Sequence, residues 1–76
     1  MAAIISAVKT IITKRGAKMA FVRVYDDASE KEFTLFESAY NLSYAALKEG
    51  NLVCISYEKD PRNEGKYFAR LIEALP

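Results

Sequence analysis

Hydrophobic and polar residues alternate over much of this chain, which is the pattern of β-strands with one buried face. The clearest example is the strand predicted for residues 19–25, where small aliphatic side chains occupy one face. The other face carries a row made of Met19, Phe21, Arg23 and Tyr25. Aromatic and arginine side chains in one row are unusual for a face that meets only water, so this row is the first candidate binding surface.

The same reasoning, with Gly, Pro, Asn and Asp as turn signals, predicts five strands and one helix. The strands cover residues 4–13, 19–25, 32–36, 51–58 and 67–75. Turns are predicted at 14–18 and 26–30, and a loop at 59–66. The helix is predicted to begin at Glu37 or Ser38 and end at Glu49, with Gly50 as its C-terminal cap and Tyr40, Tyr44 and Leu47 facing inward.

Three strands, a helix and two further strands form the order of an OB-fold. We therefore expect an all-β domain with one helix, a five-stranded barrel in which the helix lies between strands 3 and 4. The predicted core is Val22, Val24, Phe33, Leu35, Val53, Ile55 and Ile72. Phe36, Tyr40 and Tyr44 are expected to pack in the core or along the helix, and Cys54 is expected to be a small buried hydrophobe.

Composition narrows the range of functions. The 76 residues suffice for a single domain spanning 1–76, and the net charge of +1 argues against a tight duplex-binding protein. The chain has no histidine and one cysteine, so we expect no enzymatic activity of this domain alone, no metal site and no cofactor. No apolar run could span a membrane and no signal peptide is evident, so a cytoplasmic protein is expected.

Charge is nevertheless unevenly distributed along the chain. Five cations fall within fifteen residues, with no acidic residue before Asp26, while residues 26–37 are acidic. The five are Lys9, Lys14, Arg15, Lys18 and Arg23. Aromatic side chains beside basic groups suit a single-stranded nucleic acid, which stacks its bases and presents its phosphates.

The segment Thr13–Phe21, which reads T-K-R-G-A-K-M-A-F, resembles a signature in the OB domain of the bacterial DNA polymerase III alpha subunit. The similarity extends over nearly the whole chain and is shared in part with anticodon-binding domains of class II aminoacyl-tRNA synthetases. It implies an excised domain of a longer bacterial polymerase chain, with Phe21, Arg23, Tyr25 and Glu32 lining the binding face. One departure is that Ser56-Tyr57 stands where relatives have a strand-bending glycine.

The predicted role is to hold single-stranded template DNA weakly and in a salt-sensitive way, beside the rest of the polymerase or other replisome proteins. The candidate contacts are Lys14, Arg15, Lys18, Phe21, Arg23, Tyr25, Lys59, Arg62, Lys66 and Tyr67. Two alternatives remain open: a protein-interaction module within the replisome, and a tRNA anticodon-binding domain. Arg23 could also pair with Glu32 across the strands, which would withdraw its charge from the face.

Overall fold

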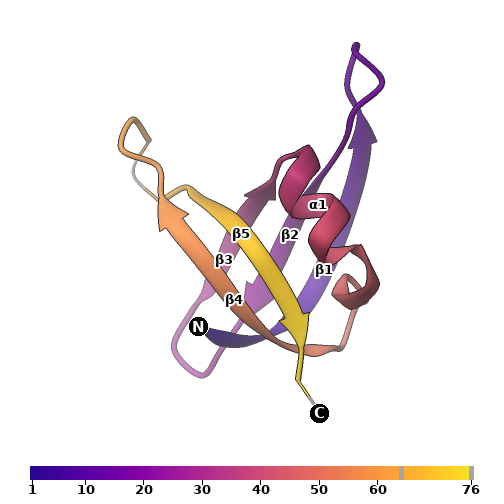
Figure 1. Ribbon diagram of the computed structural model, residues 1–76. Helices are drawn as coiled ribbons and strands as arrows, with labels where there is room; N and C mark the ends of the chain where they lie inside the picture. Colours follow the sequence, from indigo (N-terminus) through magenta and orange to yellow (C-terminus); the bar gives the residue numbers. More distant parts are fainter. Residues whose placement is uncertain (64, 76) are drawn as a thin grey trace.

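The computed structural model describes residues 1–63 and 65–75; Glu64, within the predicted loop, and Pro76 lie outside the described residues. In these ranges five strands close into a barrel in the order β1-β2-β3-β5-β4, and the helix α1 lies between β3 and β4 in the chain (Figure 1). The elements are β1 (Ala2–Ile12), β2 (Lys18–Tyr25), β3 (Glu30–Leu35), α1 (Glu37–Ser43), the 3-10 turn η1 (Tyr44–Ala46), β4 (Leu52–Lys59) and β5 (Tyr67–Ala74). The predicted OB-like barrel is confirmed.

The barrel is built from an antiparallel meander and a hairpin. β2 pairs with both β1 and β3, and β4 pairs with β5, all antiparallel. Two shorter junctions close the cylinder: β1 meets β4 through Ala2–Ile4, and β3 runs parallel to β5 at Phe33 and Thr34. Closure leaves few unpaired strand edges, which suits a domain of this size.

Bulges provide the bends that a small barrel requires. On β1, Ile5 pairs with Val24 and Ala7 with Arg23, so Ser6 is an extra residue. On β5, Arg70 is the extra residue, because the partners of Ser56 and Tyr57 on β4 are Leu71 and Ala69. The irregularity between β4 and β5 therefore lies beside Ser56 and Tyr57, the residues at which the sequence departs from the resemblance.

Every residue of the predicted core is buried. Val22, Val24, Phe33, Leu35, Val53, Ile55 and Ile72 are all at most 2% exposed. Phe33 occupies the barrel interior and packs against the rings of Tyr57 and Tyr67, with centroids 5.3 and 5.6 Å away. Alternation in the sequence identified this core correctly because each strand buries one face.

The helix is shorter than predicted, and its buried face differs. α1 ends at Ser43 rather than Glu49, and small residues face the barrel: Ala39, Ser43 and, in η1, Ala46. Tyr40 and Leu47 pack against the core as expected, whereas Tyr44 is 64% exposed. Small side chains allow the helix backbone to approach β5 closely enough for Ser43 Oγ to accept the Ile72 N–H at 2.9 Å.

Three further expectations are corrected. Gly50 does not cap the helix; it has φ +87° in the turn before β4, where its N–H donates to Ile5 O. Phe36 is 53% exposed and packs against Phe68 at the surface, outside the core. Cys54 is exposed because it alternates with Val53 and Ile55, which occupy the inward positions of β4.

Candidate nucleic-acid interface

The outer face of β1, β2 and β3 carries the predicted row. Phe21 lies opposite Lys9 of β1 and Thr34 of β3, and the next row along joins Ala7, Arg23 and Glu32. A shallow hollow of about 400 Å³ opens here, lined by Ala7, Val8, Lys9, Phe21, Arg23 and Glu32. The structure thus brings an aromatic ring and a lysine side by side on an open surface.

Phe21 is half-buried, so one part of its ring is supported by the sheet while another borders the hollow. A ring held in this way can receive a base by stacking, and such a contact is sequence-tolerant because every base has a π-face. Lys9 was noted as part of the basic cluster but was not among the candidate contacts. Its position beside Phe21 follows from the β1–β2 register, which the alternation pattern does not contain.

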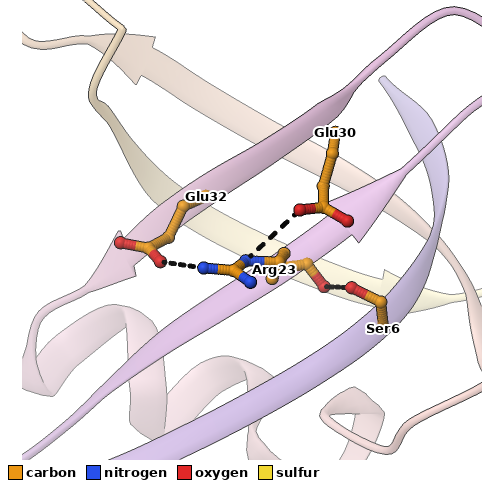
Figure 2. A network of polar contacts seen from close by, with 4 residues as sticks. All are labelled: Ser6, Arg23, Glu30 and Glu32. Carbon is orange, nitrogen blue, oxygen red and sulfur yellow. Dashed lines mark hydrogen bonds and ion pairs between the residues drawn. The ribbon is translucent and has the colours of Figure 1, made fainter.

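Arg23 is engaged by two carboxylates on β3. Its Nε lies 3.5 Å from Glu30 Oε1 and its Nη2 lies 3.6 Å from Glu32 Oε2, as Figure 2 shows. The Ser6 hydroxyl donates to the Arg23 carbonyl oxygen in the same view. All three charged side chains are more than half exposed, so each ion pair contributes little stability. One cation between two carboxylates leaves this part of the face negative, which disfavours a phosphate.

Tyr25 shares the face but borders a different hollow. It is 43% exposed and lines a depression of about 330 Å³ together with Leu52 and the acidic turn at Asp26 and Asp27. Hydrogen bonds from the Ala28 and Ser29 N–H groups to Oδ1, 2.8 and 2.9 Å long, hold the pKa of Asp26 below its ordinary value of 3.8. Tyr25 therefore stands beside fixed negative charge.

The basic turn forms the tip of the β1–β2 hairpin. Thr13 N–H donates to Ala17 O at 2.8 Å and Gly16 N–H donates to Thr13 O at 2.9 Å, which encloses a three-residue loop. Gly16 has φ +84°, the left-handed conformation that this loop type requires and that glycine adopts without strain. Lys14, Arg15 and Lys18 are all exposed, so the tip presents three cations to solvent.

The β4–β5 loop carries the second basic set, and a carboxylate organises it. Asp60 is buried, and its carboxylate accepts the Arg62 N–H at 2.9 Å and the Asn63 Nδ2–H at 3.1 Å, which lowers its pKa from 3.8. Lys59, Arg62 and Lys66 are exposed around it. In Figure 1 this loop and the β1–β2 tip rise from the upper part of the barrel on opposite sides, so they flank the barrel and do not meet.

Tyr67 takes a structural position. Its ring lies 5.5 Å from that of Tyr57 and 5.6 Å from that of Phe33, and Lys31 Nζ stands 5.6 Å from its centre. It packs on the interior side of the barrel, away from the hollow beside Phe21. The predicted contacts therefore do not form one continuous site. Phe21 and Arg23 border one hollow, whereas Tyr25 borders another. The two basic sets occupy separate loops, and Tyr67 packs against the barrel core.

The geometry defines the class of this protein as an OB-like barrel with an open, partly charged outer sheet face. No protein-family model, curated protein or solved structure matches the chain. Residues 1–63 and 65–75 contain no group of three or more potential metal ligands. In the same ranges, no helix combines the length and apolarity needed to cross a bilayer.

Proposed function

We propose that this domain is a single-stranded nucleic-acid-binding OB module that holds template DNA near the active site of a replicative DNA polymerase III alpha subunit. The observation that carries the proposal is the juxtaposition of Lys9 and Phe21 in one open hollow. Oligonucleotide-binding barrels of this topology use the same strand face and the loops that flank it. The polymerase assignment rests on the resemblance of residues 13–21.

In the proposed complex a base stacks on Phe21, a contact worth about 1–3 kcal/mol. The adjoining phosphate meets Lys9, and further phosphates meet Lys14, Arg15 and Lys18 at the hairpin tip. Lys59, Arg62 and Lys66 guide the strand beyond the barrel. The domain itself carries out no catalytic step, and the mode of binding needs no metal or cofactor.

Affinity is expected to be low. Glu30 and Glu32 hold Arg23, and the Asp26–Asp27 turn adds negative charge beside Tyr25. Binding should therefore depend on a few lysine–phosphate contacts and weaken steeply with salt. Each phosphate neutralised contributes a slope of about 0.7 to the fall of log K with log salt for a single strand.

The test is an NMR titration of the labelled domain with short oligo-dT at low salt. Shifts at residues 9, 14–25 and 59–66 that diminish together as salt is added would support the proposal. The absence of shifts at millimolar DNA would overturn it for the isolated domain.

Matched variants make the titration specific. Phe21→Ala should weaken binding by about fivefold or more, as loss of a stacking contact of about 1–3 kcal/mol implies. Tyr44→Ala removes an exposed aromatic on η1, away from the hollow, and should leave affinity unchanged. Lys9→Ala and the exposed Lys48→Ala form the corresponding pair for charge. Equal effects of both members of a pair would indicate non-specific attraction.

A protein-interaction module is the second candidate, and the ion pairs of Arg23 favour it. A face whose arginine is already neutralised is better suited to another protein surface than to phosphates, and fold alone does not decide function. The discriminating test is whether Arg15→Ala and Phe21→Ala reduce DNA binding while leaving partner binding intact. An anticodon-binding role would instead appear as stronger binding of oligo-U than of oligo-dT.

A further inference from the structure

The second half of β1 has an open edge. β1 pairs with β2 along most of its length, but its register with β4 covers only Ala2–Ile4 among the described residues. Beyond this junction β1 continues towards the hairpin tip, away from β4 (Figure 1). An unpaired strand edge is a template for another strand.

The hydrogen bonds at the tip show which backbone groups face this edge. Thr13 N–H donates to Ala17 O in the direction of β2, and backbone groups point alternately to the two sides of a strand. Lys9 and Ile11 therefore direct their N–H and C=O groups towards β2. Val8, Thr10 and Ile12 direct theirs towards the open edge.

The segment Val8–Ile12 has little protection against pairing beyond the single charge of Lys9. It contains no proline, and the bulge of β1 lies before it at Ser6. Four of its five residues are β-branched, a type that favours strands. Ile12 is 67% exposed, which leaves a large aliphatic side chain in water at the end of the edge.

We infer that this edge pairs with the same edge of a second copy of the chain, antiparallel, about a twofold axis at Thr10. Thr10 then lies opposite Thr10 of the second copy, and Val8 lies opposite Ile12. In this register the edge-facing groups of Val8, Thr10 and Ile12 in both copies are all partnered, because each opposed pair exchanges two hydrogen bonds.

Side chains and charge favour self-pairing in this register. Lys9, the one charged residue of the segment, falls opposite Ile11 and not opposite another lysine. The exposed Ile12 covers the half-buried Val8 of the other copy. Electrostatic repulsion between two copies is also weak, because each carries a net charge of only +1. Because five residues from each copy form a small interface, the association depends on protein concentration.

Pairing of this type joins the two outer sheet faces. The axis is perpendicular to the sheet, so β3-β2-β1 of one copy continues into β1-β2-β3 of the other, with both Phe21 side chains on the same side. The dimer does not rest on the proposed function, although it would double the length of the proposed binding surface.

Sedimentation equilibrium of the protein without nucleic acid tests the inference. The weight-average mass should rise from 8.5 kDa towards twice that value across a concentration series reaching about 1 mM. Thr10→Pro removes an edge-facing N–H without removing a β1–β2 hydrogen bond, and should keep the protein at 8.5 kDa. Thr10→Val retains that N–H and should preserve dimerisation.

A second variant covers the case in which Thr10→Pro fails to fold. Ile12→Lys, at an exposed position, should also yield a monomer, with unchanged circular dichroism. Amide exchange at Val8, Thr10 and Ile12 should slow as protein concentration rises. A wild-type monomer at all concentrations would overturn the inference, as would a dimer that survives both disruptive variants or is lost with Thr10→Val.

Discussion

Ser43 Oγ accepts the backbone N–H of Ile72 at 2.9 Å inside the domain, and this bond ties α1 to β5 two residues after the Arg70 bulge. Both residues are at most 1% exposed, so water cannot replace the bond if it is lost. The contact explains why a polar residue occupies the buried face of the helix.

Ser43→Ala should therefore destabilise the domain by about 1–3 kcal/mol, the cost of leaving a buried N–H without a partner. Urea unfolding followed by circular dichroism measures the change. Ser38→Ala is the matched control, because Ser38 lies on the exposed side of the same helix and should change stability by less than about 0.5 kcal/mol. Equal effects of the two variants would contradict the role of the buried bond.

Gly16→Ala should cost about 1–2 kcal/mol, the penalty of a left-handed conformation for a residue with a Cβ. No atom lies within 4 Å of the position the Cβ would occupy, so the penalty comes from the backbone at φ +84° and not from a clash. Gly16→Asn should cost less, because asparagine tolerates this region better. Thermal unfolding of the two variants measures the difference; a cost for asparagine equal to that for alanine would argue against a conformational origin.

Removing the carboxylates around Arg23 should strengthen nucleic-acid binding. In the double variant Glu30→Gln and Glu32→Gln, the guanidinium loses both ion pairs and becomes available to phosphate. Since exposed pairs are worth about 0.2–1 kcal/mol each, affinity for oligo-dT at low salt should rise up to several-fold.

The salt dependence of the same double variant should steepen by about 0.7, as expected for one additional phosphate contact. Arg23→Gln in the otherwise natural sequence should weaken binding, because it leaves Glu30 and Glu32 uncompensated on the binding face. Fluorescence anisotropy at several salt concentrations tests both statements. An unchanged affinity in both the double variant and Arg23→Gln would show that this charge cluster lies outside the bound strand's path.

Acid should destabilise the domain through Asp26 and Asp60. Both carboxyl groups have a pKa below 3.8 in the folded protein because they accept hydrogen bonds from neighbouring groups. The unfolded chain then takes up these protons first as pH falls. The stabilisation is complete above 3.8 and is lost as pH falls through the lower pKa values of the folded state.

Denaturant unfolding between about pH 6 and pH 2 measures this loss. Asp60→Asn cannot titrate, so its unfolding free energy should decline less between these limits than that of the natural protein. Asp27→Asn is the control, since Asp27 accepts no hydrogen bond in the described part of the chain. An identical acid response in natural protein and Asp60→Asn would exclude the Asp60 contribution.

The strands were predictable because each buries one face, and their bounds agree with the prediction to within two residues. The helix end was not predictable, because it depends on Ser43 meeting β5, a contact between residues far apart in sequence. A Tyr40–Tyr44–Leu47 stripe looked equally suitable for burial, but Ala39, Ser43 and Ala46 fit closer to the barrel.

For the candidate site, too, some features could be predicted from the sequence and others could not. The Phe21 row and the basic turn followed from alternation and turn chemistry within single segments. The position of Lys9 beside Phe21 depends on the register of β1 against β2, which the Ser6 bulge helps to set. The Arg23–Glu32 contact was foreseen as an alternative, whereas the additional contact with Glu30 lies along β3 and needed the structure.

The parallel junction of β3 and β5 has the shortest register of the barrel, with Phe33 opposite Tyr67 and Thr34 opposite Phe68. Backbone hydrogen bonds therefore hold the cylinder least firmly along this line. The rings of Phe33, Tyr57 and Tyr67, from three different strands, lie across it and supply side-chain cohesion where backbone pairing is sparse. We therefore expect partial unfolding to begin at this junction, where separation of the three rings would admit water to the barrel interior.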